Sequence, residues 1–223
     1  MKKYFIFWLL FIMSPCLVFA HGLQRPLPKD LHSVSEKAED LIGLYLKNDW
    51  AGAQAAVDSI SQDEASVIKA VKENKMGDSA ADVFSYLVFR SRELSHAKGN
   101  PIEAALVANQ MTSQLIDLQG FYAHTTPLEI ARMDYLGREI VLLAEVPDDF
   151  GLLDRRVAQL EQTWNHVKPV VIKQNGDKAA AEVDQVISAI KQKPSHQQLV
   201  KEANRILDLV DTLEGLFNKK IRP

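Results

Sequence analysis

The chain has 223 residues, of which 47% are hydrophobic and 25% are charged. This composition provides enough apolar side chains for a packed core and excludes an intrinsically disordered chain. Glycine (10 residues) and proline (9 residues) are sparse and aromatic residues make up 8%, which favours helices over a turn-rich β-sandwich. The formal net charge is −3, and a mildly acidic chain is a poor nucleic-acid binder, because phosphate contacts need clustered Lys and Arg.

The N-terminal segment has the pattern of a secretory signal peptide. Lys2 and Lys3 form a basic start, residues 4–13 are almost wholly apolar, and small or aliphatic residues precede a cleavage site after Ala20. We therefore expect a signal peptide over 1–20 and export of the protein to the periplasm. The apolar run is short for a retained membrane anchor, the first alternative.

The second alternative is a lipoprotein acylated at Cys16, but Pro15 directly before it fits such a recognition site badly. Cleavage after residue 20 leaves 203 residues and, with two lysines removed, changes the net charge from −3 to −5. It also removes the single cysteine of the chain. We expect the mature protein to have no disulfide, no thiolate metal site and no transmembrane segment.

Apolar residues recur at spacings of three and four along the mature chain, and no segment alternates with period two for long. This spacing is typical of helices packed at shallow angles in bundles. We predict an all-α fold, an antiparallel multi-helix bundle of about seven to eight helices. The predicted helices span 33–48, 50–75, 78–98, 100–121, 126–146, 149–174, 177–192 and 195–218.

Capping patterns mark several predicted helix starts. Ser33, Thr126 and Ser195 each stand three residues before a Glu or Gln, as in a capping box. Asn100 followed by Pro101 fits an N-cap with proline in the first turn.

The helices at the centre of the chain have very short connections, which force antiparallel neighbours. We expect residues 78–174 to form a central up-down-up-down four-helix bundle. An offset of 126 residues pairs Lys47 with Lys173 and Val57 with Val183, a hint of internal duplication. The expected organisation is a signal peptide over 1–20, an extended lead-in over 21–32, a helical bundle domain over 33–218 and a basic tail over 219–223.

Histidines provide two candidate metal sites. Cleavage makes His21 the N-terminal residue, whose α-amine and imidazole can chelate copper together with a further imidazole such as His32. Glu93 and His96 form one Glu-x-x-His pair, but the di-iron pattern needs a second pair, which the sequence lacks. The alternative is that all four residues are ordinary surface polar groups.

A b-type haem in a bundle needs an inward-facing His with a Met or a second His. Met111 and Met133 lie on apolar stripes, whereas His124 falls in a predicted loop and His166 is two residues from a tryptophan. Core packing is the alternative interpretation of the methionines.

Five charged residues interrupt or crowd apolar stripes and form a candidate buried polar cluster. Arg90 interrupts one stripe, and Arg132, Asp134, Arg138 and Glu139 crowd a single predicted helix. If Arg90 is buried, Asp134 or Glu139 on a neighbouring helix would be its partner. Such a cluster either fixes helix register or lines a ligand pocket.

No nucleotide-binding, hydrolase or metalloprotease motif occurs in the sequence. We therefore expect an exported helical bundle that acts by binding a periplasmic protein partner or a small ligand, without catalytic chemistry of its own. The alternative is a periplasmic bundle that handles copper or iron, or that binds b-type haem. An enzyme with a helical active site of unfamiliar pattern is the third interpretation.

Overall fold

A computed structural model describes residues 25–146 and 150–218 of the chain. The predicted signal peptide, His21 and the predicted basic tail lie outside these residues. Two short strands, β1 (Arg25–Pro26) and β2 (Tyr122–Ala123), accompany the helices. In the described part of the chain the helices are α1 (Lys29–Leu46), α2 (Trp50–Glu73), α3 (Asp78–Ala97), α4 (Pro101–Gln119), α5 (Leu128–Ala144), α6 (Phe150–Lys173), α7 (Asp177–Lys191) and α8 (His196–Asn218).

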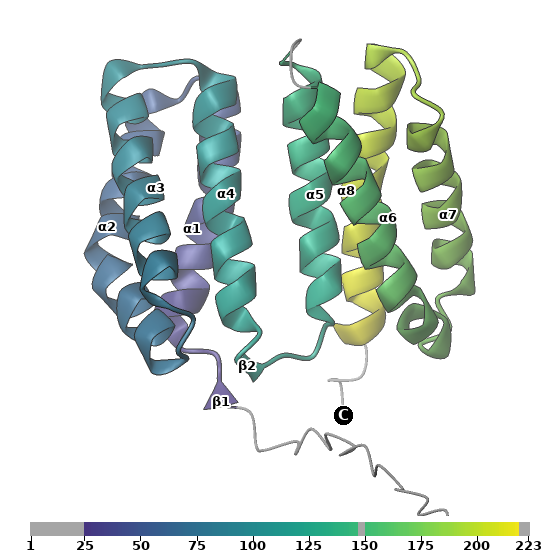
Figure 1. Cartoon of the computed structure of the whole chain (residues 1–223), viewed down its shortest axis with the longest axis horizontal. Coiled ribbons are helices and arrows are strands. Elements are labelled where there is room, and N and C mark those ends of the chain that lie inside the picture. The colour runs from purple at the N-terminus through teal and green to yellow at the C-terminus, as the bar shows by residue number, and fades with distance from the viewer. Residues whose placement is uncertain (1–24, 147–149, 219–223) are drawn as a thin grey trace, which may run out of the picture.

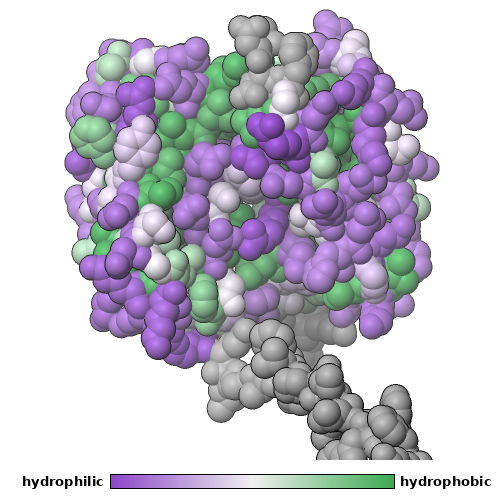
Figure 2. Space-filling model, in the orientation of Figure 1, coloured by the Kyte–Doolittle hydropathy of each residue, from purple (hydrophilic) through white to green (hydrophobic). Residues whose placement is uncertain are grey.

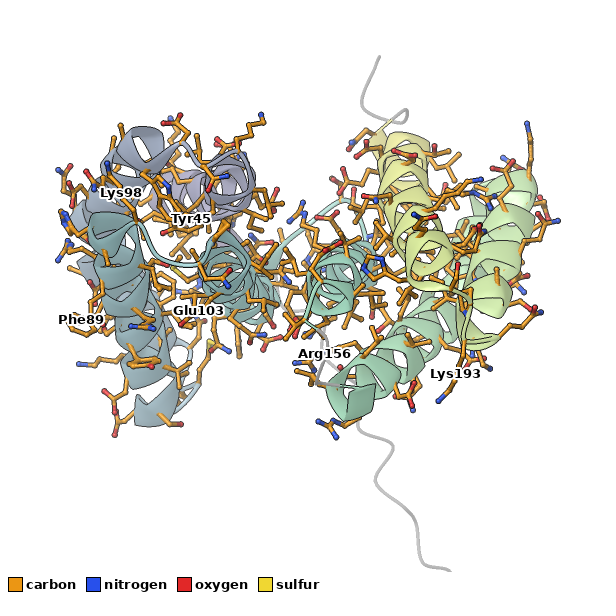
Figure 3. All side chains as sticks on the ribbon, turned by 90° about the horizontal axis from the view of Figure 1, so that it is seen from above. Tyr45, Phe89, Lys98, Glu103, Arg156 and Lys193 are labelled. Carbon is orange, nitrogen blue, oxygen red and sulfur yellow. The ribbon has the colours of Figure 1, made fainter. Side chains whose placement is uncertain are left out.

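These helices form two four-helix bundles that stand side by side (Figure 1). In the first bundle α1 and α3 each pack against α2 and α4, and in the second α5 and α7 each pack against α6 and α8. Each bundle has its own hydrophobic core. Helices α4 and α5 pack against each other at the centre of the molecule and join the two bundles (Figure 3). The predicted all-α multi-helix bundle is confirmed.

The expected central bundle over 78–174 is wrong in its grouping, because α3 and α4 share a core with α1 and α2, and α6 shares a core with α7 and α8. The connection over 120–127, between α4 and α5, separates the bundles and is longer than those at 47–49 and 98–100. A short connection makes two helices antiparallel neighbours, but it does not determine which four helices enclose a core.

The bundles repeat the same helices in the same order at a separation of about 100 residues. The predicted offset of 126 is wrong, because it aligns α2 with α7, which hold different places in their bundles. Alanine-rich helices often match by chance, and the match of α2 with α7 at this offset is such a case. A separation of 100 aligns α2 with α6, and buried residues of α2 then correspond to buried residues of α6: Ile60 to Leu160, Val67 to Val167 and Val71 to Val171.

The start of α4 follows the predicted capping. The side-chain oxygen of Asn100 accepts hydrogen bonds from the backbone N–H groups of Ile102 and Glu103. Pro101 occupies the first turn, where its missing N–H costs nothing.

Two other predicted capping boxes are not formed. Helix α1 begins at Lys29 and not at residue 33, since Pro28 is its N-cap and Ser33 lies inside the helix. The predicted lead-in is therefore shorter than expected. Helix α5 follows Pro127, and no side chain caps it, so Thr126 does not act as its cap. In both places the N-cap is a proline whose ψ is extended, 139° at Pro28 and 134° at Pro127, and the helix begins at the next residue.

The segment before α1 is tied to the connection between the bundles. Strand β1 runs parallel to β2, with Arg25 opposite Tyr122 and Pro26 opposite Ala123. The guanidinium of Arg25 also lies over the Tyr122 ring, 5.4 Å from its centroid. The segment before α1 thereby stabilises the connection over 120–127 that precedes α5.

The surface is hydrophilic over most of the face shown in Figure 2, and hydrophobic residues reach it mainly over the first bundle. The outer face of α3 contributes exposed Val83, Tyr86 and Phe89, and Phe89 points away from the bundle (Figure 3). None of the helices in the described ranges is both long enough and apolar enough to cross a membrane.

Candidate binding cavity

A cavity of about 770 Å³ lies at one end of the second bundle. Helices α5 and α7 end there and α6 and α8 begin there, at the upper end of the bundle in Figure 1. The volume falls in the range of ~300–1,000 Å³ that is usual for small-molecule sites. Its apolar lining comes from all four helices and includes Leu143, Val146, Leu153, Val157, Ile190 and Leu199.

The space exists because α6 and α7 diverge toward this end of the bundle (Figure 1). They pack against each other less extensively than their counterparts α2 and α3. A second cavity of about 330 Å³ lies between α6 and α7 and shares Glu161 and Lys191 with the first. Below these residues Trp164 Nε1 donates a 2.8 Å hydrogen bond to Asp184 Oδ1, which holds α6 and α7 together. The hollow thus extends from the bundle end along the α6–α7 interface.

The equivalent end of the first bundle is filled by Tyr45. Its side chain is fully buried, and its hydroxyl donates to the backbone oxygen of Ser91 at 3.0 Å and lies 2.8 Å from Ser95 Oγ. Its ring lies 5.8 Å from that of Trp50. A separation of 99 residues aligns α1 with α5 and places Ala144 at the position of Tyr45. The position that holds the buried ring of Tyr45 in the first bundle therefore holds only the methyl group of Ala144 in the second.

Charged side chains surround the cavity in three pairs. Among the described residues these pairs contain three carboxylates, two lysine ammonium groups and one imidazole. Lys193 marks the rim in the view of Figure 3. The pairs are Lys191 with Glu161 at 2.5 Å, Lys193 with Asp154 at 2.8 Å, and His196 with Glu145 at 3.4 Å.

A different polar group, the carboxylate of Glu139, is buried where the bundles meet. Its side chain is 1% exposed and accepts a 2.8 Å hydrogen bond from Arg156 Nε on α6. From α4, Gln110 Nε2 donates to both carboxylate oxygens at 3.2 Å. Burial, followed by the Glu139 charge, raises the pKa of the neighbouring Tyr135 hydroxyl, so it stays protonated. The cluster joins α4 of one bundle to α5 and α6 of the other.

Asp134 and Arg138 form an ion pair on α5, and Arg138 also lies 3.6 Å from Glu39 on α1. Burial raises the pKa of Asp134 to about 6, and the carboxylates of Glu39, Glu214 and Asp211 act in the same direction against Arg138. This second polar cluster therefore bridges α1, α5 and α8.

The other two members of the predicted polar cluster lie elsewhere. Arg90 is partly exposed and pairs with Glu93 at 3.2 Å and Glu103 at 2.6 Å, so its expected pairing with Asp134 or Glu139 is wrong. Arg132 pairs with Asp117 at 2.7 Å on the exposed side of α5. The five residues do not converge in one cavity, because Arg90 lies on α3 of the first bundle and Arg132 pairs with Asp117 of α4.

The metal candidates are not brought together. His32 is exposed and lies 3.8 Å from Glu36. Glu93 is engaged by Arg90, and His96 is exposed near the end of α3. Within the described residues no group of three or more His, Cys, Asp or Glu side chains has the arrangement of a metal site. The copper hypothesis at His21 and His32 and the iron hypothesis at Glu93 and His96 stay predictions.

The residues considered for haem are also distributed. Met111 and Met133 are fully buried but belong to different cores. His124 lies in the connection between the bundles, where its Nδ1 is 3.0 Å from the backbone oxygen of Tyr122. His166 is exposed and 3.5 Å from Glu129. The b-type haem hypothesis likewise stays a prediction.

The sequence did not point to the cavity residues, since Glu145, Lys193 and His196 belong to no motif. One signal was present. The apolar stripe of residues 34–45 ends in a tyrosine, whereas the stripe of residues 133–144 ends in Ala144. The difference between Tyr45 and Ala144 points to a cavity only once the two bundles are aligned. Comparison of the chain with models of protein families, with curated proteins and with solved structures gives no match.

Proposed function

We propose that the protein is exported to the periplasm and acts by binding, and that it takes a ligand with an apolar body into the cavity at the end of the second bundle. The observation that carries the proposal is the contrast between the two bundle ends. Tyr45 fills one, and a cavity of about 770 Å³ lined mainly by aliphatic side chains remains at the other. Aliphatic side chains that line an open hollow lack the packing partners that they would have in a filled core, which costs stability. Its presence in one of two matched bundles favours a binding role.

The arrangement of the lining supports the same function. Apolar side chains form the walls and charged side chains occupy the rim, which is the usual distribution in small-molecule sites. Export agrees with the signal-peptide pattern of residues 1–20.

Binding of N-phenyl-1-naphthylamine, a dye whose fluorescence increases in apolar surroundings, tests the proposal. We expect saturable binding of one dye per chain. The variant Ala144→Tyr introduces the side chain that fills the first bundle, so it should weaken binding at least about tenfold. The matched control is Ala55→Tyr, since Ala55 is an exposed helical alanine of the first bundle.

The control variant should bind the dye as the natural protein does. Thermal unfolding of both variants shows whether either has lost its fold. A folded natural protein that takes up no dye, or dye binding that Ala144→Tyr leaves unchanged in a folded protein, would overturn the proposed function.

A further inference from the structure

The cavity has a charge preference as well as an apolar lining. We infer that its ligand is an organic cation with an aliphatic body, whose protonated amine lies against Glu145 while the body fills the space among α5, α6, α7 and α8. The inference rests on the proposed function, because it names the class of ligand for the same cavity.

The pairing of the rim residues is the first support. Each rim lysine already has a carboxylate partner within 2.8 Å, so neither is available to an anionic ligand without breaking an ion pair. Glu145 is different. Its ion-pair partner in the described part of the chain is the imidazole of His196, at 3.4 Å, a longer contact than either lysine pair makes. Among the described rim residues, Glu145 is therefore the carboxylate that has no lysine partner.

The end of α5 is the second support. A helix C-terminus carries a partial negative charge and attracts cations. Glu145 is the C-cap of α5, and the last turn of this helix contains no basic residue. By contrast α7, which also ends at the cavity, has Lys191 in its last turn. The helix dipole and the carboxylate thus add at one point of the rim, where a ligand ammonium completes the charge balance.

Position and exposure are the third support. Glu145 lines the cavity next to Leu143 and Ala144, so a group bound to its carboxylate has its attached chain directed along apolar walls. The Glu145 side chain is 45% exposed, which leaves it accessible to a ligand arriving from solvent. The geometry requires no rearrangement of the two lysine pairs.

Displacement of the bound dye by three compounds with the same chain tests the inference. Dodecylammonium, dodecanol and dodecanoate differ only in their head groups and are used below the concentrations at which they aggregate. We expect dodecylammonium to bind about threefold to tenfold more tightly than dodecanol, the size of one partly exposed charge interaction, and dodecanoate to bind most weakly.

Two variants localise the effect. Glu145→Gln should remove the advantage of dodecylammonium over dodecanol and leave dodecanol binding unchanged. His196→Lys places a permanent cation beside Glu145 and should have the same result. The matched control is Glu182→Gln, because Glu182 is also half-exposed and ion-paired but lies near the opposite end of α7. It should preserve the advantage.

The outcomes separate the inference from the proposed function. If the dye and dodecanol bind but the three head groups are equivalent, or if dodecanoate binds best, the inference is overturned and the cavity remains a site for apolar ligands. If Glu145→Gln keeps the preference for dodecylammonium, Glu145 is not its origin and the inference is overturned as well. If neither the dye nor any of the three compounds binds, the proposed function fails first.

Discussion

Arg156 Nε on α6 donates a 2.8 Å hydrogen bond to Glu139 Oε1 on α5, and the Glu139 side chain is 1% exposed. A carboxylate this deeply buried is tolerated only while it is paired and hydrogen-bonded. Further donors come from Gln110 and Asn109 on α4, which belongs to the other bundle. The charge at the centre of the molecule thus depends on side chains from both bundles.

Replacing Arg156 with leucine is expected to lower the free energy of unfolding by about 2–4 kcal/mol, because it leaves Glu139 as an unpaired buried charge. Chemical denaturation followed by circular dichroism measures the loss. Adding Glu139→Gln should recover part of it, since the double variant has no buried charge. The control is Arg132→Leu, whose ion pair with Asp117 is exposed and should contribute less than about 1 kcal/mol. Equal losses for the two arginine variants would contradict the prediction.

The stability of the protein should fall as the pH rises from about 4 to about 6. Burial raises the pKa of Asp134 to about 6 in the folded state, above its ordinary value of 3.8. The folded state therefore binds more protons than the unfolded state in this interval, and its stability decreases as they are lost. Two pKa units correspond to at most about 3 kcal/mol.

Asp134→Asn should flatten the pH dependence, because the amide does not titrate. Glu39 and Glu214 also have raised pKa values, with burial as the first cause, so a shallower slope of the same sign should remain. The measurement is the free energy of unfolding at pH 4, 5, 6 and 7 for both proteins. The exposed Asp58, paired with Arg92, supplies the control variant Asp58→Asn. A natural protein that becomes more stable from pH 4 to 6 would contradict the prediction.

Tyr45→Ala is expected to destabilise the first bundle by about 3–5 kcal/mol, the usual cost of removing a large buried side chain. The loss includes the hydrogen bonds of the Tyr45 hydroxyl with Ser91 and Ser95. Tyr86→Ala, at an exposed tyrosine of α3, should change stability by less than about 0.5 kcal/mol. Tyr45→Phe separates the two contributions, because it keeps the ring and loses only the hydroxyl. Urea denaturation of the three variants gives the comparison.

Local sequence patterns predicted most helix positions, because apolar spacing and proline placement are properties of short segments. Asn100 and Pro101 illustrate this, since the cap they form involves only the next few residues. The error at Ser33 has the same origin. Pro28 competes for the helix start, and a capping box inside a helix is indistinguishable from one at its end until the start is known.

The grouping of helices and the candidate site are not local. Val57 of α2 and Leu142 of α5 both belong to the first core although they come from different bundles, and no spacing rule connects them. The sequence placed Glu139 in a candidate buried cluster but did not identify Arg156 as its partner. That pairing depends on where α6 packs against α5. The cavity is harder still, since it arises from a divergence of α6 and α7 and from the small side chain of Ala144.

Two glycines should respond to alanine substitution with opposite signs. At Gly176, between α6 and α7, an added Cβ would lie 2.6 Å from Val171 Cγ1, 2.7 Å from Leu216 Cδ1 and 2.9 Å from the backbone oxygen of Val171. That oxygen accepts the Gly176 N–H, so it is held in place by the turn itself. We expect Gly176→Ala to destabilise the protein by about 1–3 kcal/mol through overpacking.

At Gly43, inside α1, an added Cβ would meet nothing within 4 Å. Alanine restricts the unfolded chain more than glycine does, so Gly43→Ala should stabilise the protein by about 0.5–1 kcal/mol. Thermal unfolding of the two variants beside the natural protein gives both signs in one experiment. A Gly176→Ala protein as stable as the natural one would mean that the α6–α7 turn relaxes around the methyl group. The divergence of α6 and α7 that creates the cavity would then be adjustable at this turn and not fixed by it.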